Sequence, residues 1–334
     1  DRLRPHLYRD VRPARVSAWA TPGEPIPFAE AIAQRFVGIE PGEAWGPPWG
    51  TTWFRVAVDR PQEARDGDAP AATVLVVDLG FTEAVPGFQC EALAYDEAGR
   101  VLGGIEPLNR VLPLPLPGPG AFGHDAAGSE VVIWLEAAAN PDIAQQFRFT
   151  PTPLGDRATA GDAPQYRLGA IFTAVRELEL WELMQDLTVL AELGEQLDPA
   201  SPRRARIMTA LSRALDTIDT EAPEASAAAA RAQLRAVLDA PAAPSAHTVH
   251  AVGHAHIDSA WLWPLRETRR KVARTFANVL RLMEEDERFV FAASSAQHYA
   301  WLKADHPDLF ERVRARVAEG RFVPVGGQWV EPDS

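Results

Sequence analysis

The pattern of apolar residues changes twice along the chain, and the first part favours short strands. Up to about residue 165, runs rich in aromatic and β-branched residues alternate with turns that contain proline and glycine; the clearest runs are 51–59, 73–79, 91–95 and 131–136. One short helix is predicted over 28–36, and residues 151–164, with their prolines and glycines, are typical of a linker or long loop. Short strands without long intervening helices predict an antiparallel β-sandwich-like domain over 1–165.

The second part, 166–245, repeats its apolar residues at spacings of three and four, which predicts helices. The first helix is expected over 166–197. Ser201 followed by Pro202 is the usual start of a helix, and the second helix should run to about 219. An alanine-rich third helix is predicted over 223–238. Three helices with short breaks indicate a helical hairpin or small bundle whose apolar stripes form its core.

The third part, 246–334, alternates between strand and helix patterns. Strands are predicted over 248–253, 289–293 and 322–325, and helices over 267–285 and 299–319. This alternation predicts a parallel sheet. Three parallel strands leave an open sheet edge, so we expect the first units of a β/α-barrel catalytic domain that is incomplete in this chain and continues beyond Ser334.

Polar side chains follow each predicted strand of this third part, where parallel sheets place their functional residues. They are His254, His256 and Asp258 after the first strand, Gln297 and His298 after the second, and Glu331 and Asp333 after the third. Imidazole and carboxylate groups suit Zn²⁺ or another divalent cation. We predict a metal site of His256, Asp258 and Asp333. A further ligand is needed, which His254 or, preferably, a histidine beyond Ser334 would supply.

The remaining polar and aromatic residues of this region are expected to orient the ligands, to face a sugar ring or to pack in the core. His254, Gln297 and His298 are candidates for orienting the ligands, and Glu331 is expected to be structural. Trp261 offers a flat apolar face beside the metal, as a sugar ring requires, whereas Trp263 is assigned to the core. The tryptophans at 45, 49 and 53 are expected in the sandwich core or at a domain interface.

Composition restricts the classes of partner. The net charge of −13 disfavours nucleic acid, and the chain has no run approaching the roughly 20 apolar residues that span a bilayer. The single cysteine, Cys90, cannot form an intramolecular disulfide, which favours a reducing compartment and hence the cytoplasm. A homo-oligomer is left open.

Three motifs, in this order, carry a resemblance to a known family. They are GHAHIDSAWLWP over 253–264, SSAQHYAWL over 294–302 and GGQWVEPD over 326–333. Together they resemble glycoside hydrolase family 38, the zinc-dependent retaining α-mannosidases, and most closely its vacuolar, cytosolic and bacterial branch. A β-rich domain followed by helices upstream is also similar to that branch.

The resemblance implies a role for individual residues. His256 and Asp258 would be zinc ligands, Asp333 both a ligand and the nucleophile that forms a covalent glycosyl-enzyme, and Trp261 the residue beneath the mannose ring. It also implies that the general acid/base and the last histidine ligand lie past Ser334, so that residues 1–334 alone would be inactive. The expected substrate is an α-mannoside oligosaccharide, cleaved from its end.

Two other functions compete with this interpretation. A metal-dependent carbohydrate deacetylase also places His and Asp ligands on a β/α barrel, with a metal-activated water as nucleophile. Alternatively, the β-rich half is a non-catalytic carbohydrate-binding module and the rest is a scaffold.

Overall fold

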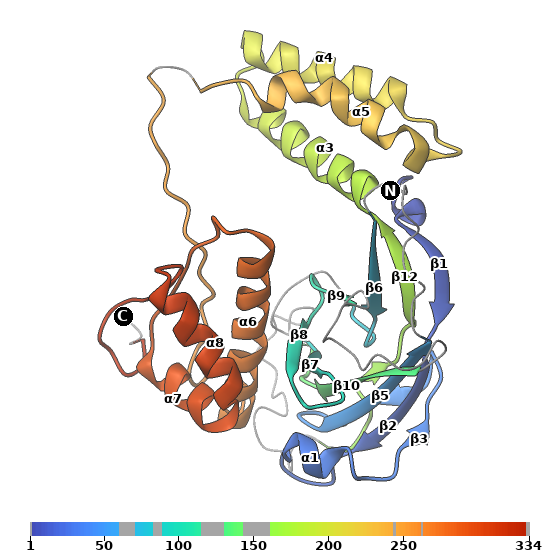
Figure 1. The fold of residues 1–334 in the computed structure, drawn as a ribbon, viewed down its shortest axis with the longest axis vertical. Helices are drawn as coiled ribbons and strands as arrows, with labels where there is room; N and C mark the ends of the chain where they lie inside the picture. The colour runs from blue at the N-terminus through green and yellow to red at the C-terminus, as the bar shows by residue number, and fades with distance from the viewer. Residues whose placement is uncertain are drawn as a thin grey trace.

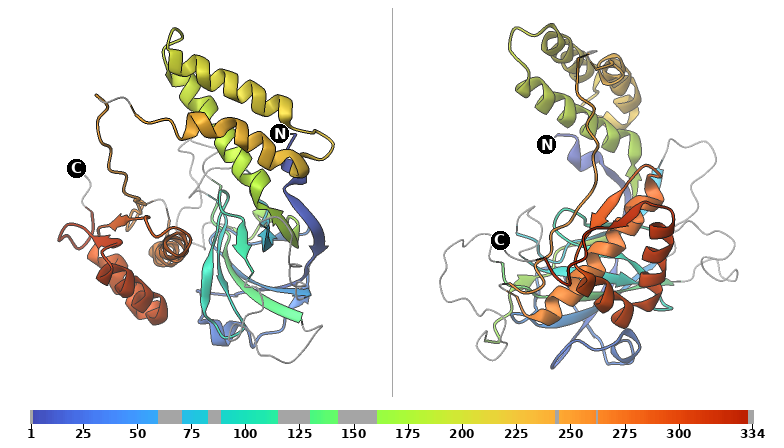
Figure 2. Two further views of the ribbon diagram at one scale, coloured as in Figure 1. Left: turned by 45° about the horizontal axis from the view of Figure 1, so that its top comes forward. Right: turned by 90° about the vertical axis from the view of Figure 1, so that its left-hand side faces the viewer.

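The computed structural model of the protein describes residues 2–59, 71–82, 89–114, 130–142, 161–242, 245–261 and 263–331. Figure 1 shows a β-sandwich, a bundle formed by helices α3, α4 and α5 (Leu178–Gln196, Pro202–Thr217 and Pro223–Leu238) beyond one end of it, and a smaller α/β part beside it. The chain leaves the bundle as an extended segment and reaches the α/β part, whose helix α6 (Leu265–Glu285) lies against the sandwich. In both views of Figure 2 the helical bundle lies beyond one end of the sandwich, and the left view also shows the α/β part beside the sandwich.

The sandwich consists of two antiparallel sheets, which confirms the sequence prediction for this part. The first has six strands in the order β3 (Val37–Gly38), β2 (Arg15–Ala20), β5 (Thr51–Asp59), β10 (Glu130–Ala138), β7 (Glu91–Tyr95) and β8 (Val101–Ile105). The second has four, in the order β1 (Tyr8–Pro13), β12 (Ile171–Glu177), β6 (Ala71–Val77) and β9 (Val111–Pro113). Short strands β4 (Ala44–Trp45) and β11 (Tyr166–Arg167) form a separate pair. The short helices are η1 (Arg4–His6) and α1 (Phe28–Ala31), so the helix predicted over 28–36 is shorter than expected.

The six-stranded sheet is buried on both faces, because the side chains of its strands point alternately to one face and to the other. Phe54 and Val56 of β5 belong to the core between the two sheets, together with Leu75 of β6. Trp53 of β5 and Trp134 of β10 belong to a different core on the opposite face, which they share with α6. Successive side chains of a strand point to opposite faces, so one strand supplies both cores. Trp45, Trp49 and Trp53 are all buried, as predicted.

The helical bundle agrees with the sequence prediction except at its start. Helices α4 (Pro202–Thr217) and α5 (Pro223–Leu238) begin and end close to the predicted limits, and the Ser201 hydroxyl accepts a hydrogen bond from the Arg203 N–H at 3.3 Å. The helix predicted from residue 166 is wrong up to residue 177. That stretch contains β11 and β12, and helix α3 covers only Leu178–Gln196. The domain boundaries predicted at 165 and 245 remain predictions.

The α/β part contains α6, β13 (Phe291–Ala293), α7 (Ala296–Asp305), α8 (Pro307–Ala318) and β14 (Phe322–Pro324). Strands β13 and β14 pair in parallel, as predicted. The strand predicted over 248–253 is wrong, because only Gly253 pairs, through a parallel bridge to Phe291, and the side chains of Val249 and Val252 are 85% and 54% exposed. The single helix predicted over 299–319 is also wrong, since His306 and Pro307 divide it.

Buried charges join α6 to the six-stranded sheet. Glu91 of β7 lies 2.6 Å from Lys271 Nζ and 2.7 Å from Arg274 Nε, and Arg274 also pairs with Glu267 in the first turn of α6. The side chains of Glu91, Glu267 and Arg274 are about 5% exposed or less. Burial by itself raises the pKa of Glu91, but Lys271 and Arg274 outweigh that effect and lower its pKa to about 2.

Substitution of Glu91 by Gln tests this network. At neutral pH the free energy of unfolding should fall by about 3–5 kcal/mol, because Arg274 stays buried and loses a carboxylate partner. The deficit relative to the wild type should be constant above pH 4.5. It should shrink as the pH falls towards 2, since a carboxylate with a lowered pKa stabilises only while it is ionised.

Urea unfolding at several pH values measures the effect, with Glu40→Gln, a change of an exposed glutamate of the same part, as the control. A deficit that does not change between pH 7 and pH 3 would contradict the assignment.

Candidate metal centre

The candidate site lies beyond the ends of the parallel strands β13 and β14 and of the segment that bridges to β13 at Gly253. The Gly253 N–H donates to the Val290 carbonyl at 2.8 Å, and β13 pairs on its other side with β14. The segments that follow β13 and β14 also lie side by side, since the N–H groups of Ala296 and Gln297 donate to the carbonyls of Gln328 and Trp329. Gly253 permits the close approach, because a Cβ there would lie 2.9 Å from the Phe289 ring.

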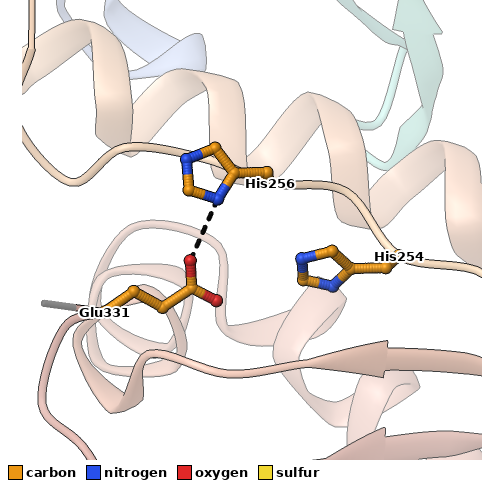
Figure 3. A group of neighbouring side chains, drawn as sticks. All are labelled: His254, His256 and Glu331. Carbon is orange, nitrogen blue, oxygen red and sulfur yellow. Dashed lines mark ion pairs between the residues drawn. The ribbon is translucent and has the colours of Figure 1, made fainter. Parts of the chain in front are cut away.

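His256 stands at the middle of the site with a carboxylate near each ring nitrogen. Its Nε2 lies 3.1 Å from Asp258 Oδ1, and its Nδ1 lies 3.0 Å from Glu331 Oε2, as Figure 3 shows for the second contact. Ile257 between them is buried in the core, which turns His256 and Asp258 away from it. The hydrogen bond with Asp258, and the nearby Glu331, raise the pKa of His256.

Glu331 is itself held by the segment that follows β13. The Ser294 hydroxyl donates to Oε1 of Glu331, and the Glu331 N–H donates to the Ser295 hydroxyl at 3.2 Å. The bond from Ser294 lowers the pKa of Glu331. Ser295 is buried and has a φ of 61°, a left-handed conformation that is uncommon for a residue with a side chain. The sequence predicts a structural role for Glu331, whereas the structure places its carboxylate among the candidate ligands.

Two overlapping sets of donors could hold a cation. His254, His256 and Glu331 offer ligand atoms that all lie within 4.8 Å of one another. The other set is the predicted pair His256 and Asp258. Two donors about 2.0–2.1 Å from a tetrahedral zinc ion lie about 3.3 Å apart, close to the observed spacing of Nε2 and Oδ1. The imidazole and carboxylate donors fit zinc in either case. Asp333, the third predicted ligand and predicted nucleophile, lies outside the described residues.

The three candidates for orienting the ligands, His298, Gln297 and His254, each have a partner of their own. His298 is buried, which lowers its pKa, and its Nε2 lies 3.0 Å from the Ser259 hydroxyl. Gln297 contributes its backbone N–H to the contact with Trp329. His254 places Nδ1 at 2.9 Å from the Ala292 carbonyl, an arrangement that leaves Nε2 as the nitrogen with the lone pair.

An aromatic corner follows the donors along the chain. The rings of Trp261 and Trp263 meet edge to face with centroids 5.3 Å apart. Trp263 is fixed, because its Nε1–H donates to Thr268 at 2.9 Å, and Thr268 donates to the Ser259 carbonyl at 3.1 Å. Trp261 is 47% exposed. Trp329, on the segment after β14, is 62% exposed and had no role in the sequence prediction.

Comparison with known proteins defines the class of the two main parts. Residues 246–334 match the family model described as the glycosyl hydrolases family 38 N-terminal domain. Residues 12–170 match the model described as the α-mannosidase jelly roll domain, in agreement with the two-sheet sandwich. The chain thus combines a region similar to the α-mannosidase jelly roll domain with a region similar to the family 38 N-terminal domain.

Whole-chain relatives point to the same family. The sequence is 32% identical to alpha-mannosidase 2C1 of Mus musculus and to that of Homo sapiens, over 99% of this chain and 30% of each relative. It is 25% identical to alpha-mannosidase G of Dictyostelium discoideum over 93% of this chain and 26% of that protein. Residues 246–334 are thus similar to the N-terminal domain of glycoside hydrolase family 38, and the chain spans about 30% of the length of the first two relatives.

Replacement of His256 by Ala tests the donor set. Zinc affinity of the full-length protein, measured by competition with a chromophoric chelator, should fall by more than about 100-fold, because partners of a ligand alone typically contribute 10- to 100-fold. His250→Ala, which changes an exposed histidine on the extended segment before the site, is the control and should bind zinc as the wild type does. Equal affinities for His256→Ala and the wild type would exclude both donor sets.

Proposed function

We propose that the protein is a retaining α-mannosidase that removes terminal α-linked mannose from oligosaccharides with the help of zinc or another divalent cation. The observation that carries the proposal is the His256–Asp258 donor pair, held at the end of a parallel sheet within the family 38 domain. The names of the relatives, all α-mannosidases, supply the substrate class. The parallel segments then form the beginning of a β/α barrel.

In this proposal His256, Asp258 and Asp333 hold the cation. When bound, the cation supplies a positive charge that orients vicinal sugar hydroxyls. Trp261 provides the exposed aromatic face on which the mannose ring stacks, and Trp263 fixes its position from the side. His256 serves as a ligand through its neutral form.

Asp333 would carry out the covalent step. Its carboxylate oxygen bonds to the anomeric carbon while the glycosidic bond breaks, and a second carboxyl group gives a proton to the leaving oxygen. Water then attacks the same carbon, returns a proton to that second group and releases mannose with retention of configuration. Retention requires the two carboxyl groups to be about 5–5.5 Å apart.

We place the protein in the cytoplasm. Cys90 is buried and forms no disulfide, and burial raises the pKa of its thiol, so it is suited to packing rather than to exchange with other thiols. The helices of the described residues include none that is long and apolar enough to cross a membrane.

A mechanism-based fluoromannoside tests the nucleophile in the full-length protein. The label should be found on the peptide that contains Asp333, and Asp333→Ala should abolish labelling together with hydrolysis of an aryl α-mannoside. Asp308→Ala, on the exposed start of α8, should leave both unchanged. Removal of the metal by a chelator should also stop hydrolysis, and added zinc should restore it.

Hydrolysis that persists after complete removal of the metal would contradict the zinc-assisted mechanism. Release of acetate from an acetylated sugar, without labelling of Asp333, would instead identify a deacetylase.

The role of Trp261 is tested separately from the chemistry. Trp261→Ala should raise the KM for an aryl α-mannoside about tenfold, equivalent to about 1.4 kcal/mol, because the stacking surface is lost while the donors remain. Trp181→Ala, a change of a partly exposed tryptophan on α3 of the helical bundle, is the control. An unchanged KM in Trp261→Ala would rule out stacking on this ring.

A further inference from the structure

We infer that Glu331 is a positioning residue that fixes His256 as a metal ligand, by accepting the Nδ1–H of its ring so that Nε2 presents its lone pair on the side of Asp258. The inference rests on the zinc site of the proposed function and extends it, because Glu331 is not one of the residues predicted to bind the ion.

The contacts of His256 carry the first step. A neutral imidazole has one N–H donor and one lone pair, so a partner that takes the N–H at one nitrogen assigns the lone pair to the other. Glu331 Oε2 lies 3.0 Å from Nδ1, and Asp258 Oδ1 lies 3.1 Å from Nε2. Since a metal replaces a proton at the nitrogen that it binds, only one of the two carboxylates can share an ion with His256, and the other must hold the N–H.

The surroundings of Asp258 and Glu331 indicate which carboxylate shares the ion with His256 and which accepts the N–H of its ring. Asp258 follows His256 by two residues, so both side chains leave the same segment and can meet one ion together. Glu331 comes from the segment after β14 and has separate supports, with Ser294 donating to Oε1 and Ser295 accepting from its backbone N–H. With Oε1 engaged, Oε2 is the oxygen left to face His256, as Figure 3 shows. Carboxylate–histidine–zinc triads of this kind orient the ligand ring.

The backbone at Ser295 supports a dedicated arrangement. Ser295 is buried and has a φ of 61°, a left-handed conformation that is strained for a residue with a side chain. Ser295 in this conformation precedes the first residue of α7. The hydroxyl of Ser294 then contacts the carboxylate of Glu331, and the hydroxyl of Ser295 contacts the Glu331 backbone N–H.

Zinc affinity and stability of matched variants of the full-length protein test the inference. Glu331→Ala should weaken zinc binding by about 10- to 100-fold, and Glu331→Gln should recover most of that loss, because the amide oxygen still accepts the Nδ1–H. Ser294→Ala should weaken binding in the same direction by a smaller factor. Glu287→Ala, a change of an exposed glutamate at the opposite end of β13, should have no effect.

Two further readouts separate positioning from a merely structural role. With the metal removed, Glu331→Ala should keep the Tm of the metal-free wild type, and only the rise in Tm on adding zinc should become smaller. In the cobalt-substituted protein, the visible absorption bands of Glu331→Ala should shift relative to the wild type and return in Glu331→Gln, since the orientation of the ligand ring changes.

Several outcomes would overturn the inference. One is wild-type zinc affinity in Glu331→Ala. Another is a loss in both Glu331→Ala and Glu331→Gln as large as that of His256→Ala, which would make Glu331 a ligand in the set with His254. A wild-type protein that binds no zinc would remove the metal site of the proposed function, and this inference with it, whereas the first two results leave that function intact.

Discussion

The packing of α6 on the six-stranded sheet is the contact on which the arrangement of the other parts depends. The helix starts seven residues after Asp258, so its position sets where the donor segment can lie. Its apolar face shares a core with Trp53 and Trp134 of the sandwich. Apolar contacts alone tolerate small shifts, whereas the buried Glu91–Arg274–Glu267 group requires its charges to meet in one register. The jelly roll therefore acts as a fixed base for the first helix of the hydrolase domain.

How well the sequence predicts an element depends on whether its determinants are local. Helices α4 and α5 were predicted closely because Ser201 with Pro202, and Pro223, mark their starts within the sequence. The sequence wrongly predicts a helix over the stretch of β12, because Ile171, Phe172 and Val175 fit a helical spacing as well as a strand. What decides for a strand is pairing with β1 and β6, which lie about 100 residues or more away in the sequence. No local pattern contains that information.

The same division applies to the candidate site. The spacing of His256 and Asp258 around buried Ile257 identified a donor pair, and the structure holds the two side chains in contact. The place of Glu331 could not be predicted, because it depends on the parallel pairing of β13 with β14 and on the left-handed backbone of Ser295. The one available signal was the pair of serines directly after the strand. Their polarity was visible, but their target lies 36 or 37 residues further along the chain.

The electrostatics of the site connect its metal-free and metal-bound forms. Asp258 and Glu331 bring two carboxylates to one imidazole, in a chain whose net charge is already −13. The hydrogen bond with Asp258 and the charge of Glu331 raise the pKa of His256, so they favour a proton on its ring. A divalent cation at Nε2 would offset the negative charges of the two carboxylates with a larger positive charge, and it would displace the proton from that nitrogen. The arrangement that favours protonation is thus also the one that favours a cation, and the two compete for a single position on the ring.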